Sequence, residues 1–153
     1  MSYANCEIVV REIHERDLGI DFCTTLSNLA DVGELILDKN LILELYFAIK
    51  KKSNSKIFVA ILENKIVGSI TTIIEQKFIH NGGKVCHIED VVTRKGYEKM
   101  GIGSLLVKKA IEFAILENCY KVILSCSEQN FSFYQKNGFY KHEITMRLDI
   151  DKI

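Results

Sequence analysis

The chain has 153 residues, of which 48% are hydrophobic and 26% are charged, and these proportions are ordinary for a globular protein. A chain of this length is expected to fold as one domain, residues 1–153, around a single core. Because its 20 basic and 20 acidic residues cancel to a formal net charge of zero, the composition gives no support to nucleic acid or an anionic membrane as a partner.

Hydrophobic periodicity predicts alternating strands and helices, without a repeat or a linker. Apolar residues at helical spacing, such as Leu18 and Phe22, predict a helix over 15–33 that stops at Gly33. A second helix, over 40–52, has a basic last turn that suits its dipole. In chain order the expected strands are 7–13, 56–62, 66–76, 85–93, 120–126 and 139–149, and the further expected helices are 104–117 and 127–138.

The order of these elements indicates an α/β fold. The first half resembles an antiparallel meander with a hairpin turn at 63–65, and the second half resembles strands joined by covering helices. We therefore expect a mixed, mostly antiparallel central sheet with helices on both faces. In the helix over 104–117, one face is expected to carry Leu105, Ala110, Ile111, Ala114 and Ile115.

The cysteines and the apolar segments indicate a cytoplasmic protein. The five cysteines are an odd number, with no C-x-x-C pair and no metal-ligand spacing, so we expect free thiols in a reducing compartment and no metal site. The N-terminus lacks the basic and apolar regions of a signal peptide. The longest apolar stretch is interrupted by Glu44 and is too short to span a bilayer.

Two glycines, Gly101 and Gly103, stand between a predicted strand and a predicted helix. Glycine lets backbone amides approach a ligand closely, and a helix start attracts anions, so this loop is a candidate phosphate site. The alternative is that the glycines only permit a tight turn. The loop is neither a P-loop, since Ser104 follows Gly103 directly, nor a dinucleotide fingerprint, since Leu106 replaces the third glycine. Glu98, an acid at the front of the loop, is unexpected in an anion site.

The stretch 91–110 resembles the acetyl-CoA pyrophosphate motif [QR]-x-x-G-x-[GA] of the Gcn5-related N-acetyltransferases, although it departs from that motif at Glu98. The blocks KFIH (77–80), HIEDVV (87–92), CYK (119–121) and NFSFYQKNG (130–138) resemble one branch of that superfamily, the glucosamine-6-phosphate N-acetyltransferases. This resemblance extends over roughly residues 7–146. It implies the superfamily fold and transfer of acetyl from acetyl-CoA to the C2 amine of glucosamine 6-phosphate by direct attack in a ternary complex. It also implies an intertwined homodimer with sites at the subunit interface.

The resemblance assigns the chemistry to Glu89, Asp90 and Tyr134. Neighbouring residues of a regular strand point to opposite faces, so one of the two carboxylates is expected at the site and the other in a structural contact, although the resemblance places both at the sugar. A carboxylate or a strand carbonyl there orients the amine and accepts its proton. The phenol of Tyr134, with an ordinary pKa of about 10, is the expected proton donor to the departing thiolate. Without the resemblance, a solvated strand end and a core aromatic would be the simpler interpretations.

The resemblance also assigns two sets of ligands. The backbone at Val91, Val92 and Thr93 is expected to bind pantetheine, and one N–H there to stabilise the oxyanion. The other expected acetyl-CoA contacts are Lys99, Met100, Gly101, Ile102, Gly103, Ser104, Asn130, Tyr134, Gln135 and Lys136. The expected substrate ligands are Lys77, Phe78, Ile79, His80, Glu89, Asp90, Tyr120, Lys121 and Ser125, with no metal.

Three positions depart from the family pattern on the sugar side. Ala30 lacks a hydroxyl, Ser125 stands where an acid is common, and Arg147, next to Leu148 and Asp149, is displaced from the usual phosphate-binding place. Another small amine or a peptide amine therefore remains an alternative substrate, and a non-catalytic acetyl-CoA-binding module is a third hypothesis. Glu98 would repel a phosphate by about 1 kcal/mol in water and about 4 kcal/mol at a lower effective dielectric, so we expect it to point away, toward Arg94, Lys95 or Lys99.

Overall fold

The computed structural model describes residues 6–152. The strands are β1 (Val9–Glu12), β2 (Ser55–Leu62), β3 (Lys65–Gln76), β4 (Lys84–Thr93) and β5 (Cys119–Ile123). The helices are α1 (Ile20–Leu26), α2 (Lys39–Lys51), α3 (Ile79–Gly82), α4 (Ile102–Leu116) and α5 (Phe131–Lys136). Short 3-10 turns are η1 (Glu15–Asp17), η2 (Gly33–Leu37), η3 (Glu128–Asn130) and η4 (Ile150–Lys152).

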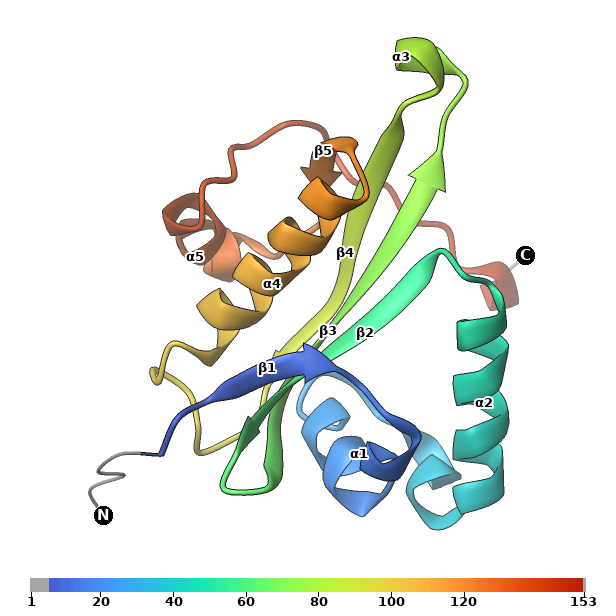
Figure 1. Cartoon of the computed structure of the whole chain (residues 1–153), viewed down its shortest axis with the longest axis vertical. Coiled ribbons are helices and arrows are strands. Elements are labelled where there is room, and N and C mark those ends of the chain that lie inside the picture. Colours follow the sequence, from blue (N-terminus) through green and yellow to red (C-terminus); the bar gives the residue numbers. More distant parts are fainter. Residues whose placement is uncertain (1–5, 153) are drawn as a thin grey trace.

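The five strands form one mixed sheet in the order β1-β2-β3-β4-β5. The first four are antiparallel neighbours, while β5 runs parallel to β4 because α4 carries the chain back across the sheet (Figure 1). A tight turn at Glu63 and Asn64, both in the left-handed region, closes the β2–β3 hairpin. The predicted mixed, mostly antiparallel sheet is confirmed.

Helices cover both faces of this sheet (Figure 1). On one face α4 packs on β2, β3 and β4, and the core there includes Phe58, Ile70, Ile88, Leu106, Val107 and Ala110. On the other face α1 and α2 form a second core, which includes Phe22, Ile42, Tyr46, Val59 and Ile66. Successive side chains of a strand point to opposite faces of the sheet, so neighbours such as Phe58 and Val59 belong to different cores.

Several predicted boundaries were wrong. The helix predicted over 15–33 is the turn η1 followed by the short α1, because the backbone at Gly19 is extended and separates them. On α4 the side chains of Leu105 and Ile115 are 38% and 68% exposed rather than buried. The buried stripe starts instead at Ile102, and the positions that follow it by four and by eight residues, Leu106 and Ala110, lie under the helix.

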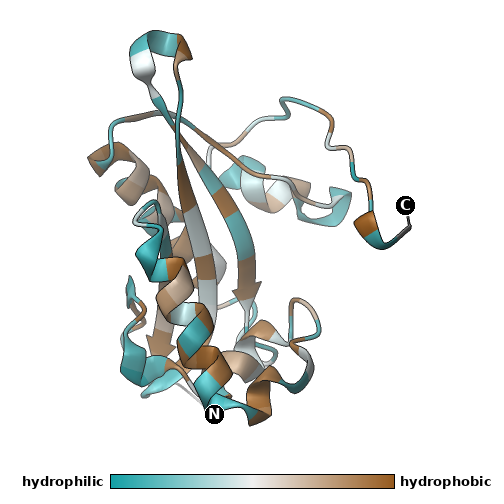
Figure 2. Cartoon of the chain, turned by 90° about the vertical axis from the view of Figure 1, so that its right-hand side faces the viewer, coloured by the Kyte–Doolittle hydropathy of each residue, from teal (hydrophilic) through white to brown (hydrophobic). Residues whose placement is uncertain are grey.

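The strand predicted over 139–149 is also wrong. This segment has no strand pairing, and it leaves the body of the molecule toward the C-terminus (Figure 2). Its sequence alternates as a strand does, but the side chains of Tyr140, Ile144, Met146 and Leu148 are 81%, 87%, 91% and 71% exposed. Among the described residues the sheet ends at β5, whose outer edge has no strand beside it, and this segment does not pair with that edge. We call residues 139–152 the C-terminal arm.

No helix in the described part of the chain is long and apolar enough to cross a membrane, and the longest, α4, has 15 residues.

Gly68 in β3 sets the distance between the sheet and α4. A Cβ at this position would lie 2.7 Å from Cγ2 of Ile102, 2.9 Å from Cδ1 of Leu106 and 3.1 Å from the carbonyl oxygen of Val92. We expect Gly68→Ala to lower the free energy of unfolding by about 1–3 kcal/mol, measured by urea denaturation, because α4 must move outward. Gly19→Ala is the control, since a Cβ at Gly19 would meet no atom within 4 Å. Equal losses in the two variants would contradict close packing at Gly68.

Candidate active site

β4 has a free edge over half of its length. β5 pairs with β4 only from Lys84 to His87, and after Ile123 the chain leaves the sheet. Residues 88–93 of β4 therefore have β3 on one side and no strand on the other, so part of their N–H and C=O groups is available to a ligand. The predicted pantetheine-binding residues Val91, Val92 and Thr93 all lie on this free edge.

A β-bulge lies in the middle of the free edge. Thr71 faces Glu89 and Ser69 faces Val92, so β4 has one residue more than β3 between these pairs. Asp90 takes up the extra residue in the left-handed region, with φ 51°. The expectation that Glu89 and Asp90 point to opposite faces assumed a regular strand, and the bulge removes that assumption. Both carboxylates are exposed.

The glycine loop follows β4 and leads into α4. Gly101 has φ 78°, and Lys99 is left-handed at φ 64° although it has a Cβ. Gly103 lies directly under α5, because a Cβ there would be 3.0 Å from Cζ of Phe133. The first intrahelical bond is donated by the N–H of Leu105, so the N–H groups before it are available to an anion.

A groove of about 880 Å³ starts at this loop and runs along α4 beside the end of α5. Among the predicted cofactor residues, Met100, Gly101, Ser104 and Lys136 line it. The sequence-based prediction missed its other lining residues, which are Leu105, Lys108, Ile111, Glu112, Asn137 and Gly138. The spacing of Lys108 and Glu112 by four and eight residues from Ser104 was the available signal, because such positions share a helix face.

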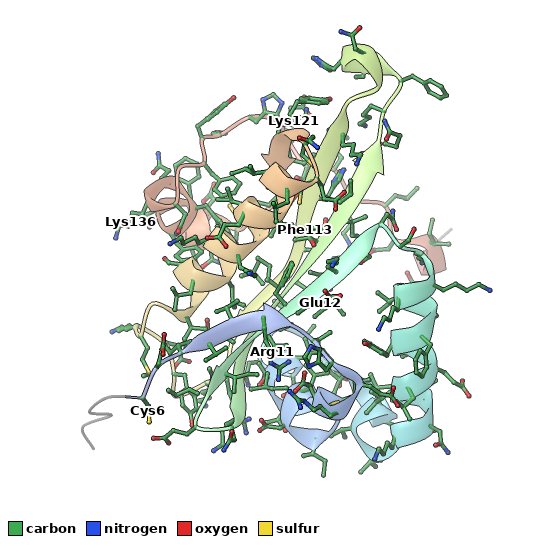
Figure 3. All side chains as sticks on the ribbon, viewed as in Figure 1. Cys6, Arg11, Glu12, Phe113, Lys121 and Lys136 are labelled. Carbon is green, nitrogen blue, oxygen red and sulfur yellow. The ribbon has the colours of Figure 1, made fainter. Side chains whose placement is uncertain are left out.

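The remaining predicted cofactor residues have different surroundings. The side chain of Ile102 is 1% exposed and belongs to the core, so only its backbone can meet a ligand. Asn130 and Gln135 are exposed and lie outside the residues that line the groove. Lys136 is at the outer end of α5 (Figure 3).

Tyr134 is a buried phenol on α5. Its ring packs edge-on against Phe133 and Phe139, with ring centroids 4.9 and 5.9 Å away. Tyr134 is 9% exposed. Among residues 6–152, no side chain or backbone group is hydrogen-bonded to its hydroxyl. Burial raises the pKa of the Tyr134 phenol above its ordinary value, and the nearby Cys126 thiol adds to this shift. The phenol therefore remains protonated at neutral pH and is able to donate.

Glu98 is part of the loop framework. Its Oε2 accepts a hydrogen bond of 2.7 Å from the N–H of Gly96, so the carboxylate turns back to its own loop. We expected Glu98 to point toward Arg94, Lys95 or Lys99. That expectation was wrong, because the partner of Glu98 is the backbone amide of Gly96. Arg94 instead pairs with Asp21 on α1.

Several predicted sugar-phosphate ligands gather at the tip of the β3–β4 hairpin, which projects beyond the body (Figure 1). The ring of His80 lies on the ring of Tyr120, with centroids 4.2 Å apart, and Lys121 is the next residue in β5. Phe78 and Ile79 are 103% and 63% exposed. The loop predicted here contains the short α3, with His80 and Asn81 both left-handed.

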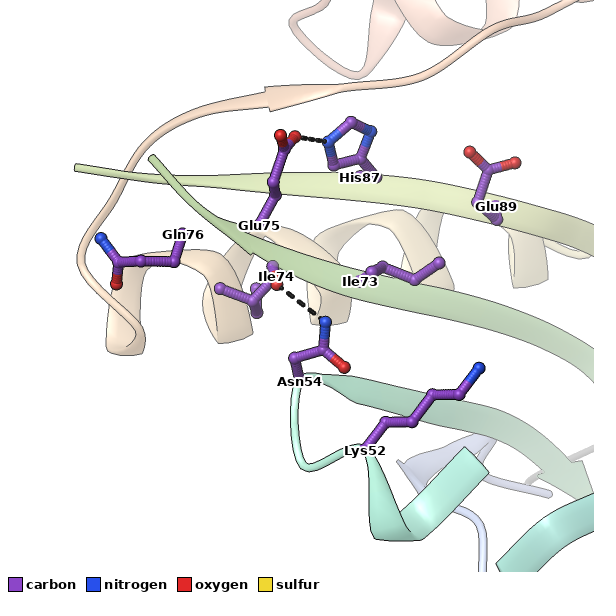
Figure 4. A pocket seen from close by; sticks show the side chains of 8 residues that line it. All are labelled: Lys52, Asn54, Ile73, Ile74, Glu75, Gln76, His87 and Glu89. Atoms are coloured by element: carbon purple, nitrogen blue, oxygen red, sulfur yellow. Dashed lines mark hydrogen bonds and ion pairs between the residues drawn. The ribbon is translucent and has the colours of Figure 1, made fainter. Parts of the chain in front are cut away.

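A second polar group lies further down the sheet, around a hollow of about 540 Å³ (Figure 4). Glu75 is bonded to Lys77 at 2.6 Å and to the ring of His87 at 2.7 Å. The Lys77 ammonium and the His87 ring lower the pKa of Glu75. Glu89 and Lys52 line the same hollow. Sequence-based reasoning did not place Lys52, Glu75 or His87 at the site, although His87 belongs to the matched block 87–92.

The structure does not bring the two carboxylates and the hairpin tip together within one chain. Tyr120 is the second residue of β5, and its neighbours Cys119 and Lys121 pair with Lys84 and Val85 of β4. Glu89 lies four to five residues further along β4, which is about 13–17 Å at about 3.3 Å per residue. The positions that depart from the family pattern have contacts of their own or are exposed. Ala30 is exposed in the turn after α1, Ser125 is hydrogen-bonded to Thr145 of the C-terminal arm at 2.8 Å, and Arg147 pairs with Asp149 at 2.6 Å.

Among residues 6–152 no group of three or more His, Cys, Asp or Glu side chains is arranged to hold a metal ion.

The sequence and the fold are both similar to those of known acetyltransferases. The model of the Acetyltransferase (GNAT) family matches residues 24–139. Glucosamine 6-phosphate N-acetyltransferase of Trypanosoma brucei brucei is 43% identical over 96 residues, which are 63% of this chain and 65% of that protein. Glucosamine 6-phosphate N-acetyltransferase 1 of Dictyostelium discoideum is 31% identical over 140 residues, or 90% of this chain and 86% of that protein. The crystal structure of glucosamine-6-phosphate N-acetyltransferase from Arabidopsis thaliana superimposes with a TM-score of 0.89 at 29% identity, covering 95% of this chain and 99% of that one.

Proposed function

The chain belongs to the acetyltransferase (GNAT) family, and from this membership we propose that it transfers the acetyl group of acetyl-CoA to the C2 amine of glucosamine 6-phosphate. The products are N-acetylglucosamine 6-phosphate, an intermediate for amino-sugar synthesis, and CoA. The observation that carries the proposal is the free edge of β4, which leads into the glycine loop and shares a core cluster with Tyr134. The names of the relatives support the choice of sugar. We infer a cytoplasmic location from the odd number of cysteines without a disulfide.

Acetyl-CoA is the first substrate. The free N–H groups at the start of α4 and the backbone of the glycine loop bind its pyrophosphate, and Lys108 and Lys136 supply positive charge in the adjoining groove. The pantetheine arm takes the place of a missing strand along 91–93. One backbone N–H of this edge then donates to the thioester oxygen as negative charge develops on it.

Direct attack by the amine requires a proton acceptor and a proton donor. Glu89 and Asp90, at the bulge, are the two carboxylates of the free edge 88–93, and they orient the amine and accept its proton directly or through water. Tyr134 donates its phenol proton to the departing thiolate of CoA. Its raised pKa suits this role, because the phenol is fully protonated before transfer.

The sugar phosphate is bound by the hairpin tip of a second copy of the chain. Within one chain the tip, with His80, Tyr120 and Lys121, is too far along the sheet from Glu89 to share a hexose phosphate. Phe78 at the tip and the side chains of Ile144 and Met146 in the C-terminal arm are exposed within the described chain. A homodimer with sites at the interface would cover both segments. The resemblance implies the same arrangement.

The substrate assignment is tested by release of CoA, followed with a thiol reagent. We expect glucosamine 6-phosphate to release CoA well above the no-amine background, and more efficiently than glucosamine, other small amines or a peptide amine. The departures at Ala30, Ser125 and Arg147 make the amine panel necessary, because each lost charge-assisted contact costs about 1.5–3 kcal/mol. Faster release with a different amine would replace the substrate, and binding of acetyl-CoA without release for any amine would leave a non-catalytic module.

Tyr134→Phe tests the proton donor. We expect turnover to fall about 10²-fold, because general acid catalysis is lost, while the Kd of CoA measured by calorimetry changes by less than about twofold. Tyr46→Phe is the matched control, since Tyr46 is also buried but belongs to α2, on the other face of the sheet. If turnover is unchanged in Tyr134→Phe, Tyr134 has no part in the reaction.

Substitutions in the C-terminal arm test whether the chain forms a dimer. The side chains of Ile144 and Met146 are 87% and 91% exposed in one chain. We expect the double variant Ile144→Asp and Met146→Asp to sediment as a monomer, because the two aspartates would place unpaired charges in the interface. Lys141→Asp, which changes an exposed polar residue of the same arm, should leave the dimer intact. Sedimentation of the unmodified chain as a monomer at micromolar concentration would contradict the proposal.

A further inference from the structure

The segment 94–101 connects the free edge of β4 to α4 through three left-handed residues. These are Gly96, Lys99 and Gly101, with φ of 91°, 64° and 78°. A lysine in this region is strained, so the loop needs contacts from outside to keep its path. Consecutive residues at the start of the loop are held by side chains, and two of those side chains come from α1 and the turn that follows it.

Asp21 on α1 holds the first residue of the loop. Its carboxylate forms an ion pair with the guanidinium of Arg94 and also accepts a hydrogen bond of 2.6 Å from the N–H of Ile66 in β3. The N–H of Arg94 donates to the carbonyl of Val67 at 2.7 Å. Both the side chain and the backbone of Arg94 are therefore fixed between α1 and the β2–β3 hairpin.

Asn28, in the turn after α1, holds the second residue. Its side-chain Oδ1 accepts a hydrogen bond of 2.8 Å from the N–H of Lys95. The N–H of Gly96, the third residue, is bonded to Glu98 within the loop. Side-chain oxygens of Asp21, Asn28 and Glu98 thus bind the three successive residues 94, 95 and 96.

We propose that Asp21 and Asn28 are positioning residues for the glycine loop. They touch neither substrate. They fix the backbone at Arg94 and Lys95, and this fixes the direction in which Gly101 and the start of α4 present their N–H groups. Such preorganisation lowers the conformational cost of binding an anion. The inference rests on the proposed use of this loop for the CoA pyrophosphate, and it gives α1 a part in cofactor affinity.

Asn28→Ala removes the acceptor, and Asn28→Asp retains one at the same place. We expect Asn28→Ala to raise the Kd of CoA about fivefold to tenfold, with kcat changed less than about twofold, and Asn28→Asp to restore the affinity to within about twofold of the unmodified chain. The control is Asp38→Ala, because Asp38 makes a similar bond of 3.0 Å to the N–H of Leu41 at the start of α2. This control should lower stability without changing the Kd of CoA.

A double-mutant cycle tests Asp21. We expect Asp21→Asn and Arg94→Gln each to raise the Kd of CoA, and the double variant to be no worse than the worse single variant, since one interaction joins the two residues. Hydrogen exchange of the amides of residues 96–101, measured without ligand, gives an independent readout. Exchange should be faster in Asn28→Ala, restored in Asn28→Asp and unchanged in Asp38→Ala.

The two measurements separate the possible failures. Unchanged exchange in Asn28→Ala would overturn the inference, because the loop would then not depend on Asn28. Faster exchange with an unchanged Kd of CoA would overturn it as well, since the contact would be structural only. If the unmodified chain itself does not bind CoA, the proposed function fails and with it the positioning role, whereas the exchange data still decide whether α1 fixes the loop.

Discussion

A strand edge inside a protein has to satisfy its N–H and C=O groups, and the separation of β5 from β4 leaves such an edge open along residues 88–93. The rest of the candidate site is arranged around this opening. The glycine loop follows this edge directly, and α4, which begins after the loop, has free N–H groups in its first turn. The bulge at Asp90 interrupts the pairing of the same strand on its other side. A linear ligand with amide groups and a terminal phosphate is complementary to this series of donors and acceptors.

The glycine loop differs from the family motif in its front side chain. Glu98 stands where the family motif has Gln or Arg, and its carboxylate is bonded to the amide of Gly96. Phosphate recognition at such a loop depends mainly on backbone donors, and the positive end of the helix dipole acts in the same direction. The lysines of the groove, Lys108 and Lys136, contribute charge from positions that the motif does not cover.

Much of the fold and part of the site followed from the sequence, for identifiable reasons. The strands and the long helices α2 and α4 were predictable because their apolar residues repeat regularly. The segment 139–149 has the same alternation but does not pair with any strand of the described chain, and a pattern of side chains contains no information about whether a strand pairs with a neighbour. The bulge at Asp90 was missed because it changes the backbone without changing the hydrophobic pattern. The contact of Asp21 with Arg94 and that of Asn28 with Lys95 join residues 73 and 67 positions apart in the chain, which no local pattern reveals.

The free edge of β4 has a further consequence for how this protein tolerates change. The groups that it presents to a ligand are N–H and C=O groups, which nineteen of the twenty common amino acids carry equally, so substitutions along 91–93 preserve them as long as the core packing survives. Only proline removes an N–H donor, and this chain contains no proline at any position. Replacing side chains of 91–93 one at a time would therefore change ligand binding little, whereas replacing a single backbone amide by an ester would remove an N–H donor and weaken binding.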